Sequence, residues 1–139
     1  MIIRKYEYLP EEAKEIRTQV FMKEQGFKDE FDEVDNRAIH LVLFDEDEKA
    51  LGTCRVYFNE GKSCYSIGRV AVLKSCRGKN LGAELIKGAE EAVKAQGGRK
   101  IELSGQVRAA GFYEKLGYNR RGEIYLDEGC PHISMEKIL

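Results

Sequence analysis

The sequence has no tryptophan, only two prolines, and no apolar run that approaches the roughly 20 residues of a membrane-spanning helix. Its opening residues Met1-Ile2-Ile3-Arg4 lack the apolar core of a signal peptide. Because proline occurs only at Pro10 and Pro131, no proline-rich linker divides the chain, and no repeat or low-complexity tract is present. We therefore predict a single domain over residues 1–139, large enough to bury a core and without a membrane partner.

The sequence also lacks a large net charge of either sign. The 23 lysines and arginines nearly balance the 24 aspartates and glutamates, so the net charge is −1 and we expect no affinity for nucleic acid. The four cysteines, Cys54, Cys64, Cys76 and Cys130, form no Cys-x-x-Cys pair. Their spacing argues against a zinc site and, without an export signal, against a disulfide framework. The sequence predicts a reduced cytoplasmic protein with no bound metal, and it leaves a homodimer open.

Apolar residues recur along the chain with periods of two and of three to four residues. In chain order, these patterns predict a strand over 1–6; a helix from Pro10 to near Gly26; a loop or short helix over 27–36; strands over 40–44, 51–58 and 64–73; a helix from Leu81 that ends at Gly97-Gly98; a strand over 100–103; a helix around Tyr113; and strands over 118–126 and from about His132. This order, β-α-α-β-β-β-α-β-α-β-β, is typical of an α/β fold with a mixed sheet.

A glycine-bearing loop follows the strand over 64–73 and opens the long helix. It reads Arg77-Gly78-Lys79-Asn80-Leu81-Gly82, and a helix start of this kind exposes several unpaired backbone N–H groups. Two cationic side chains beside these groups favour a multiply charged ligand such as a pyrophosphate. A Walker A loop would need Ser or Thr where Asn80 stands, and a dinucleotide fingerprint would need G-x-G-x-x-G. Neither nucleotide motif fits.

The loop resembles the R/Q-x-x-G-x-G/A signature of the GNAT superfamily of N-acetyltransferases. Arg77 and Gly82 take the first and last places of this signature, and Gly78 matches its frequent R-G-x-G-x-G/A form. Asn80 replaces the middle glycine of that form, and asparagine tolerates a left-handed backbone better than other non-glycine residues do.

A second stretch strengthens this resemblance. Residues 106–118 are similar to the N-x-x-A-x-x-x-Y-x-x-x-G-F/Y helix of the superfamily, although Gln106 replaces the usual Asn. The matching positions are Ala109, Tyr113, Gly117 and Tyr118. Three further pieces resemble the branch typified by the ElaA and YjcF-like proteins. They are V-F-M-K-E-Q at 20–25, the acidic run at 32–35 with His40, and G-C-P-H-I-S-M at 129–135.

The resemblance implies a mixed, mostly antiparallel sheet with helices on both faces, and acetyl-coenzyme A (acetyl-CoA) as co-substrate. In that family the loop amides hold the pyrophosphate and the pantetheine arm pairs with the backbone of the strand over 64–73. One N–H group of that strand would donate to the developing oxyanion. The implied cofactor-binding residues are Val70, Ala71, Val72, Arg77, Gly78, Lys79, Asn80, Leu81, Gly82, Ala83, Gln106 and Tyr113.

The resemblance also makes Tyr113 the expected general acid, because a phenol is protonated at neutral pH and can donate to a leaving sulfur. A tyrosine that only fills the core is the alternative. The general base is open, because the glutamate that many members carry on this strand is absent from residues 65–69. The candidates are His40, His132, Glu24, Glu30, Glu33 and Asp35, with a water relay as a substitute for any of them. We select His132 and Glu24 as catalytic residues; structural histidines and a solvated acidic face are the alternatives.

We therefore expect an N-acetyltransferase that moves acetyl from acetyl-CoA to a primary amine of a small molecule or peptide by direct attack in a ternary complex. The alternative is a catalytically silent acyl-CoA-binding regulatory module. An acidic rim would suit a cationic polyamine, an aminoglycoside or a lysine-bearing peptide as acceptor. Arg55, Arg69 and Arg108 would suit an amino sugar phosphate, unless each is ordinary surface charge. We interpret Cys76 as an incidental loop residue rather than a nucleophile.

Overall fold

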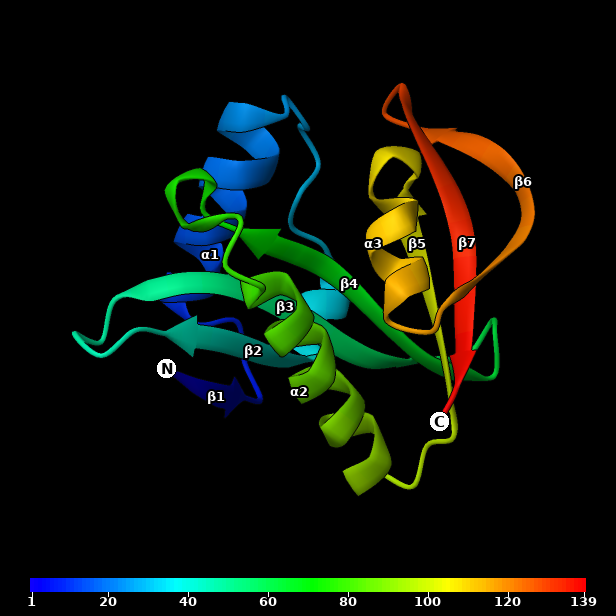
Figure 1. Cartoon of the computed structure of the whole chain (residues 1–139), viewed down its shortest axis with the longest axis horizontal. Helices are drawn as coiled ribbons and strands as arrows, with labels where there is room; N and C mark the ends of the chain where they lie inside the picture. Colours follow the sequence, from blue (N-terminus) through cyan, green and yellow to red (C-terminus); the bar gives the residue numbers. More distant parts are fainter.

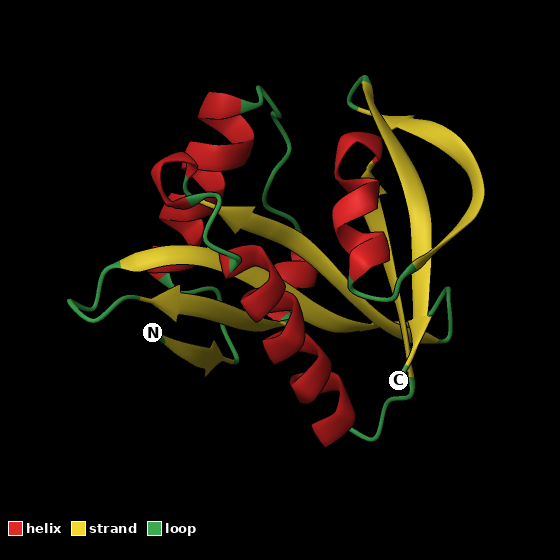
Figure 2. Ribbon diagram, in the orientation of Figure 1, coloured by secondary structure: helices red, strands yellow, loops and turns green.

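Seven strands form one mixed sheet in the computed structural model, which describes residues 1–139 (Figures 1 and 2). The strands are β1 (Ile2–Tyr6), β2 (Ile39–Phe44), β3 (Ala50–Asn59), β4 (Cys64–Val72), β5 (Lys100–Gln106), β6 (Asn119–Asp127) and β7 (Cys130–Ile138). Their order across the sheet is β1-β2-β3-β4-β5-β7-β6, and every neighbouring pair except β4 and β5 is antiparallel. The predicted α/β fold with a mostly antiparallel sheet is confirmed.

The helical segments match the predicted order. One helical segment and one strand differ from the prediction in length. The helical segments are α1 (Glu11–Arg17), the π-helix η1 (Thr18–Glu24), the 3-10 turns η2 (Glu33–Asn36) and η3 (Lys74–Cys76), α2 (Leu81–Ala95), the 3-10 turn η4 (Val107–Ala109), and α3 (Ala110–Lys115). The predicted short second helix is only the turn η2. Strand β5 runs three residues past the predicted end, because its antiparallel pairing with β7 continues to Gln106. None of the helices is long and apolar enough to cross a membrane.

Helices cover both faces of the sheet. Because successive side chains of a strand point to opposite faces, neighbouring residues of β2 enter different parts of the core. Leu41 packs with Leu85 of α2 in the main apolar cluster, whereas Val42 packs with Ala13 of α1 on the other face. The rest of α2 follows the same rule, since its buried residues recur every three or four positions.

Strands β4 and β5 pair over a short stretch and then diverge. The opening that this leaves between them contains the candidate site. They pair in parallel only at Tyr65–Ile101 and Ser66–Glu102, and beyond these residues they diverge like the arms of a V (Figure 1). The edge of β4 from 67 to 72 therefore has no strand partner on the β5 side, and neither has the facing edge of β5 from 103 to 106. Unpaired backbone groups on both arms remain available to a ligand.

Buried ion pairs tie α1, the loop before β2 and the strand β3 together. Arg17, which is 1% exposed, donates to Glu30 at 2.8 Å and to Asp35 at 2.7 Å. Arg55 of β3 donates to Asp35 at 2.9 Å and to Asp32 at 2.7 Å. The interpretation of the acidic run as a solvated face is wrong for Glu30 and Asp35, because their carboxylates compensate guanidinium groups that the fold buries. For the same reason Arg55 is not ordinary surface charge.

Candidate active site

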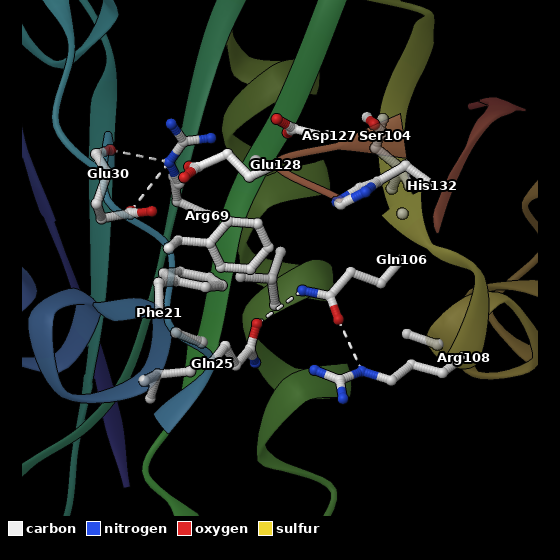
Figure 3. A pocket seen from close by; sticks show the side chains of 18 of the residues that line it. Phe21, Gln25, Glu30, Arg69, Ser104, Gln106, Arg108, Asp127, Glu128 and His132 are labelled. Carbon is white, nitrogen blue, oxygen red and sulfur yellow. Dashed lines mark hydrogen bonds and ion pairs between the residues drawn. The ribbon is translucent and has the colours of Figure 1, made fainter. Parts of the chain in front are cut away.

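A cavity of about 480 Å³ fills the opening between β4 and β5 (Figure 3). The π-helix η1 and the loop that follows it form one wall, and β5, η4 and the hairpin between β6 and β7 form the other. Eight of the predicted site residues line it: Glu24, Val70, Ala71, Val72, Arg77, Gln106, Tyr113 and His132. The cavity thus brings together side chains from both ends of the chain.

A bulge in β4 shapes the floor of this cavity. The pairing of β3 with β4 shifts register between Thr53 and Arg55, where Arg69 and Val70 have no paired residue on β3. Arg69 has a φ of 52°, a left-handed conformation that is uncommon for arginine in a strand. Its side chain turns back to Glu30, with Nε 2.9 Å from a carboxylate oxygen and 3.1 Å from the backbone oxygen (Figure 3). The buried ion pairs therefore hold the bulge in place.

Apart from Arg77, which lines the cavity, the glycine-bearing loop lies outside it, where α2 begins. Gly78 and Asn80 have φ values of 84° and 61°, so Asn80 has the left-handed backbone that its place in the signature suggests, and Gly78 shares it. No side chain caps the helix, and its first backbone bond runs from Glu84 N–H to the Asn80 carbonyl. The amides of Leu81, Gly82 and Ala83 consequently have no backbone acceptor and are free to bind an anion. The Leu81 side chain itself is 4% exposed and belongs to the core, so only its amide can serve a ligand.

Tyr113 lies on α3 and reaches the cavity from the side of β5. Tyr113 is 8% exposed, and its ring packs against Gly105 and Phe112. Its hydroxyl makes no hydrogen bond within the protein. Burial raises the pKa of Tyr113 well above that of a free phenol. The hydroxyl therefore stays protonated at neutral pH, and Tyr113 lines the cavity with no acceptor for this proton in the protein.

His132 of β7 is 8% exposed and points into the same cavity (Figure 3). Its Nδ1 lies 2.8 Å from the Cys130 backbone oxygen. Because a carbonyl oxygen can only accept a hydrogen bond, Nδ1 carries the proton, and in the neutral ring Nε2 has a free lone pair. The ring stacks on Tyr125 at 6.0 Å between centroids and meets the edge of Phe27. These contacts fix the orientation of Nε2, which is the arrangement that a general base needs.

Glu24 lines the cavity, but its carboxylate is already occupied. Arg77 donates two hydrogen bonds to it, at 2.6 and 2.7 Å, and a third to the Val72 carbonyl at 3.1 Å. The hydrogen bonds from Arg77 lower the pKa of Glu24, which weakens it as a proton acceptor. A catalytic role for Glu24 stays a prediction, and the structure adds a second role, which is to hold Arg77 beside the loop.

A hydrogen-bonded row of side chains crosses the cavity at its lower end in Figure 3. Gln106 donates to Gln25 at 2.8 Å and accepts from Arg108 Nε at 2.7 Å. The sequence motif marked Gln106, but nothing in the sequence pointed to Gln25 as its partner, because 81 positions separate them. Only the fold brings η1 to the end of β5.

Of the remaining candidates for a base, Glu30 lines the cavity, but its carboxylate binds Arg17 and Arg69. Asp35 is buried between Arg17 and Arg55 and does not line the cavity.

His40 is fully buried on β2, where its Nε2 meets the Asp35 backbone oxygen at 2.9 Å, and burial lowers its pKa. Glu33 is exposed beside Arg37 and does not line the cavity. Cys76 is 9% exposed and packs in the main apolar cluster, so it is a core residue rather than an incidental loop residue. No group of three or more His, Cys, Asp or Glu residues is arranged to hold a metal ion.

The family model described as an acetyltransferase (GNAT) domain matches residues 6–139. The chain belongs to the GNAT acetyltransferase family. It is 35% identical to the uncharacterized N-acetyltransferase YjcF of Bacillus subtilis (strain 168) over 139 residues, covering 98% of this chain and 97% of that protein. Membership of this family makes the protein an acyltransferase.

Solved structures of GNAT proteins share the fold. The crystal structure of Escherichia coli ElaA superposes with a TM-score of 0.86 at 22% identity, covering 98% of each chain. An aminoglycoside 6′-N-acetyltransferase, crystallised in complex with coenzyme A, superposes with a TM-score of 0.78 at 19% identity and covers 99% of this chain and 97% of its own. The predicted kinship with the ElaA and YjcF-like branch of the GNAT superfamily is confirmed.

Proposed function

We propose that this acyltransferase moves the acetyl group of acetyl-CoA to a primary amine of a small molecule or peptide, by direct attack in a ternary complex. The observation that carries the proposal is the meeting of two unpartnered groups in one cavity. The Tyr113 hydroxyl can donate a proton and His132 Nε2 can accept one, and they reach the opening between β4 and β5 from different elements. Acyl transfer to an amine needs this pair of functions.

The residues present fit coenzyme A. The free amides at the start of α2 suit a pyrophosphate, and the unpaired edge of β4 suits the amides of an extended pantetheine arm. The residues that would hold the cofactor are those predicted: Val70, Ala71, Val72, Arg77, Gly78, Lys79, Asn80, Leu81, Gly82, Ala83, Gln106 and Tyr113. When bound, acetyl-CoA supplies an activated acetyl thioester. The coenzyme A complex of the aminoglycoside acetyltransferase of the same fold supports this assignment.

His132 and Tyr113 divide the proton transfers between them. His132 Nε2 takes a proton from the attacking amine nitrogen, and the Cys130 carbonyl stabilises the imidazolium through Nδ1–H. Tyr113 gives its hydroxyl proton to the leaving sulfur, because burial keeps that proton in place until an anionic acceptor appears. We choose His132 over Glu24 as the base because the lone pairs of Glu24 are engaged by Arg77.

Release of free thiol from acetyl-CoA in the presence of an amine library tests this function. Amine-dependent thiol release, with the acetylated product identified by mass spectrometry, is the expected result. The silent acyl-CoA-binding module is the second candidate, and the absence of a glutamate from the β4 residues 65–69 favours it. Tight coenzyme A binding with no thiol release for any amine would identify that module and overturn the enzyme assignment.

His132→Asn should lower kcat about 100-fold and leave the Kd for coenzyme A unchanged, since a lost general base typically costs two or more powers of ten. Asparagine can still donate to the Cys130 carbonyl, so the hairpin keeps that hydrogen bond. Steady-state kinetics and coenzyme A titration measure the two quantities, and added imidazole should restore part of the rate. His40→Asn is the control for a histidine outside the cavity. An unchanged kcat for His132→Asn would assign proton removal to a water relay.

A further inference from the structure

One end of the cavity is lined by carboxylates that have no basic partner. Asp29, Asp127 and Glu128 line it, and none of them forms an ion pair with a lysine or an arginine.

Of the cavity's three arginines, Arg69 is neutralised by Glu30 and Arg77 by Glu24. The third, Arg108, forms no ion pair and lies beside Gln106, at the lower end in Figure 3. Five carboxylates therefore face three guanidinium groups: Glu24, Asp29, Glu30, Asp127 and Glu128. The electrostatic balance of the cavity therefore favours a cationic guest over an anionic one.

The fold brings these three carboxylates together from two distant segments. Asp127 ends β6, and Glu128 and Gly129 form the tight turn into β7 with φ values of 48° and 77°. The Glu128 carboxylate accepts a hydrogen bond from the Lys28 backbone N–H at 3.0 Å, across 100 positions of sequence. This bond places the hairpin beside the loop that carries Asp29.

A second observation shows that this end of the cavity is built to receive a ligand. His132 is more than nine-tenths buried, its Nε2 makes no hydrogen bond in the protein, and it points into the cavity at the end where Asp127 and Glu128 lie (Figure 3). His132 lies five positions after Asp127 and four after Glu128, so the same hairpin carries all three residues. An amine placed at Nε2 lies next to the acidic end.

We propose that the acceptor is a small amine with at least a second ammonium group, a dication or polycation, which these carboxylates bind while its reacting nitrogen meets His132. The proposal rests on the transfer reaction proposed above and names its substrate class. The unpaired carboxylates attract the second charge, and the ring of Phe27, which lines the cavity beside His132, adds a surface that favours ammonium groups. At this end of the cavity an amino sugar phosphate is disfavoured, because its phosphate would meet uncompensated carboxylates.

Equilibrium titration of the full chain saturated with coenzyme A tests the dication site without depending on turnover. The probes are 1,4-diaminobutane and its matched monoamine n-butylamine, with spermidine and kanamycin A to distinguish a linear polyamine from an amino sugar. We expect the dication to bind at least about tenfold more tightly than n-butylamine. In the double variant Asp127→Asn/Glu128→Gln this ratio should fall to about one. Glu123→Gln removes an exposed carboxylate of β6 that does not line the cavity, and it should keep the ratio of the unchanged protein.

Equal affinity for 1,4-diaminobutane and n-butylamine, or an unchanged ratio in the double variant, would overturn the proposal. Circular dichroism and thermal unfolding of the double variant separate a lost site from a lost fold. Thiol release with the same amines keeps the two proposals apart. Tight dication binding without thiol release would support the cation site and overturn the transfer reaction. Turnover of monoamines and diamines with equal kcat/KM would support the transfer reaction and overturn the cation site.

Discussion

Tyr113→Phe should lower kcat about 1,000-fold and leave the Kd for coenzyme A and the free energy of unfolding nearly unchanged. Phenylalanine keeps the ring that packs against Gly105 and Phe112, and the lost hydroxyl has no hydrogen-bond partner in the protein. Its removal therefore leaves no buried group unpaired. What disappears is the proton for the leaving sulfur, which general acid catalysis supplies at a typical gain of 10² to 10⁴. Steady-state thiol release measures kcat, coenzyme A titration measures the Kd, and urea unfolding measures the free energy of unfolding.

Tyr118→Phe is the matched control, since Tyr118 is a neighbouring buried tyrosine whose hydroxyl, unlike that of Tyr113, is hydrogen-bonded within the protein. Its hydroxyl donates to Glu90 at 2.8 Å, and Lys137 also binds that carboxylate. We expect this variant to lose about 1 kcal/mol of stability and to keep its kcat. The unchanged protein should also show no loss of kcat between pH 8 and pH 10 from Tyr113, because burial raises its pKa. A stability loss without a kcat loss in Tyr113→Phe would make Tyr113 a core residue.

Local sequence patterns were enough to predict most of the fold. Residue patterns predict each strand and the helix over 81–95, and this helix and the strands from β2 to β5 and β7 do bury residues in the core. Strand β6, by contrast, is exposed along its whole length. Asn80 replaces a glycine of the GNAT signature and is compatible with a left-handed backbone, and both Asn80 and Gly78 adopt left-handed conformations. Tyr113 was found through a motif resemblance, and the fold places it in the cavity.

The interior electrostatics could not be predicted in the same way. An acidic run such as 29–35 is usually solvated, and the sequence does not show that Arg17 and Arg55 approach it from α1 and β3. The acidic end of the cavity depends on one contact between Lys28 and Glu128, far apart in the chain. Periodicity reports which residues are buried, but pairing of charges across such distances is decided by tertiary structure.

The buried ion pairs connect stability to the site, because Glu30 binds both Arg17 in the core and Arg69 at the bulge of β4. Asp35 is the centre of this network, since it accepts hydrogen bonds from Arg17 and Arg55. Asp35→Ala should therefore lower the free energy of unfolding by about 4 kcal/mol, because two buried guanidinium groups lose their shared carboxylate. For a chain of 139 residues the melting temperature should fall by about 14 °C. Urea and thermal unfolding measure both changes.

Glu33→Ala is the control on the same turn, since Glu33 is exposed and should change stability by at most about 0.5 kcal/mol. The pH dependence follows from Asp35 itself. Burial alone would raise its pKa, but hydrogen bonds from Arg17 and Arg55 lower it to about 2, below the roughly 3.9 of an unfolded aspartate. The stability due to this charge is present above about pH 4 and is lost as the pH falls through about 2. The difference in the free energy of unfolding between the unchanged protein and Asp35→Ala should thus be constant from pH 5 to 8 and become smaller in acid. A difference that persisted undiminished at pH 2 would show that lost packing, rather than lost charge pairing, destabilises the variant.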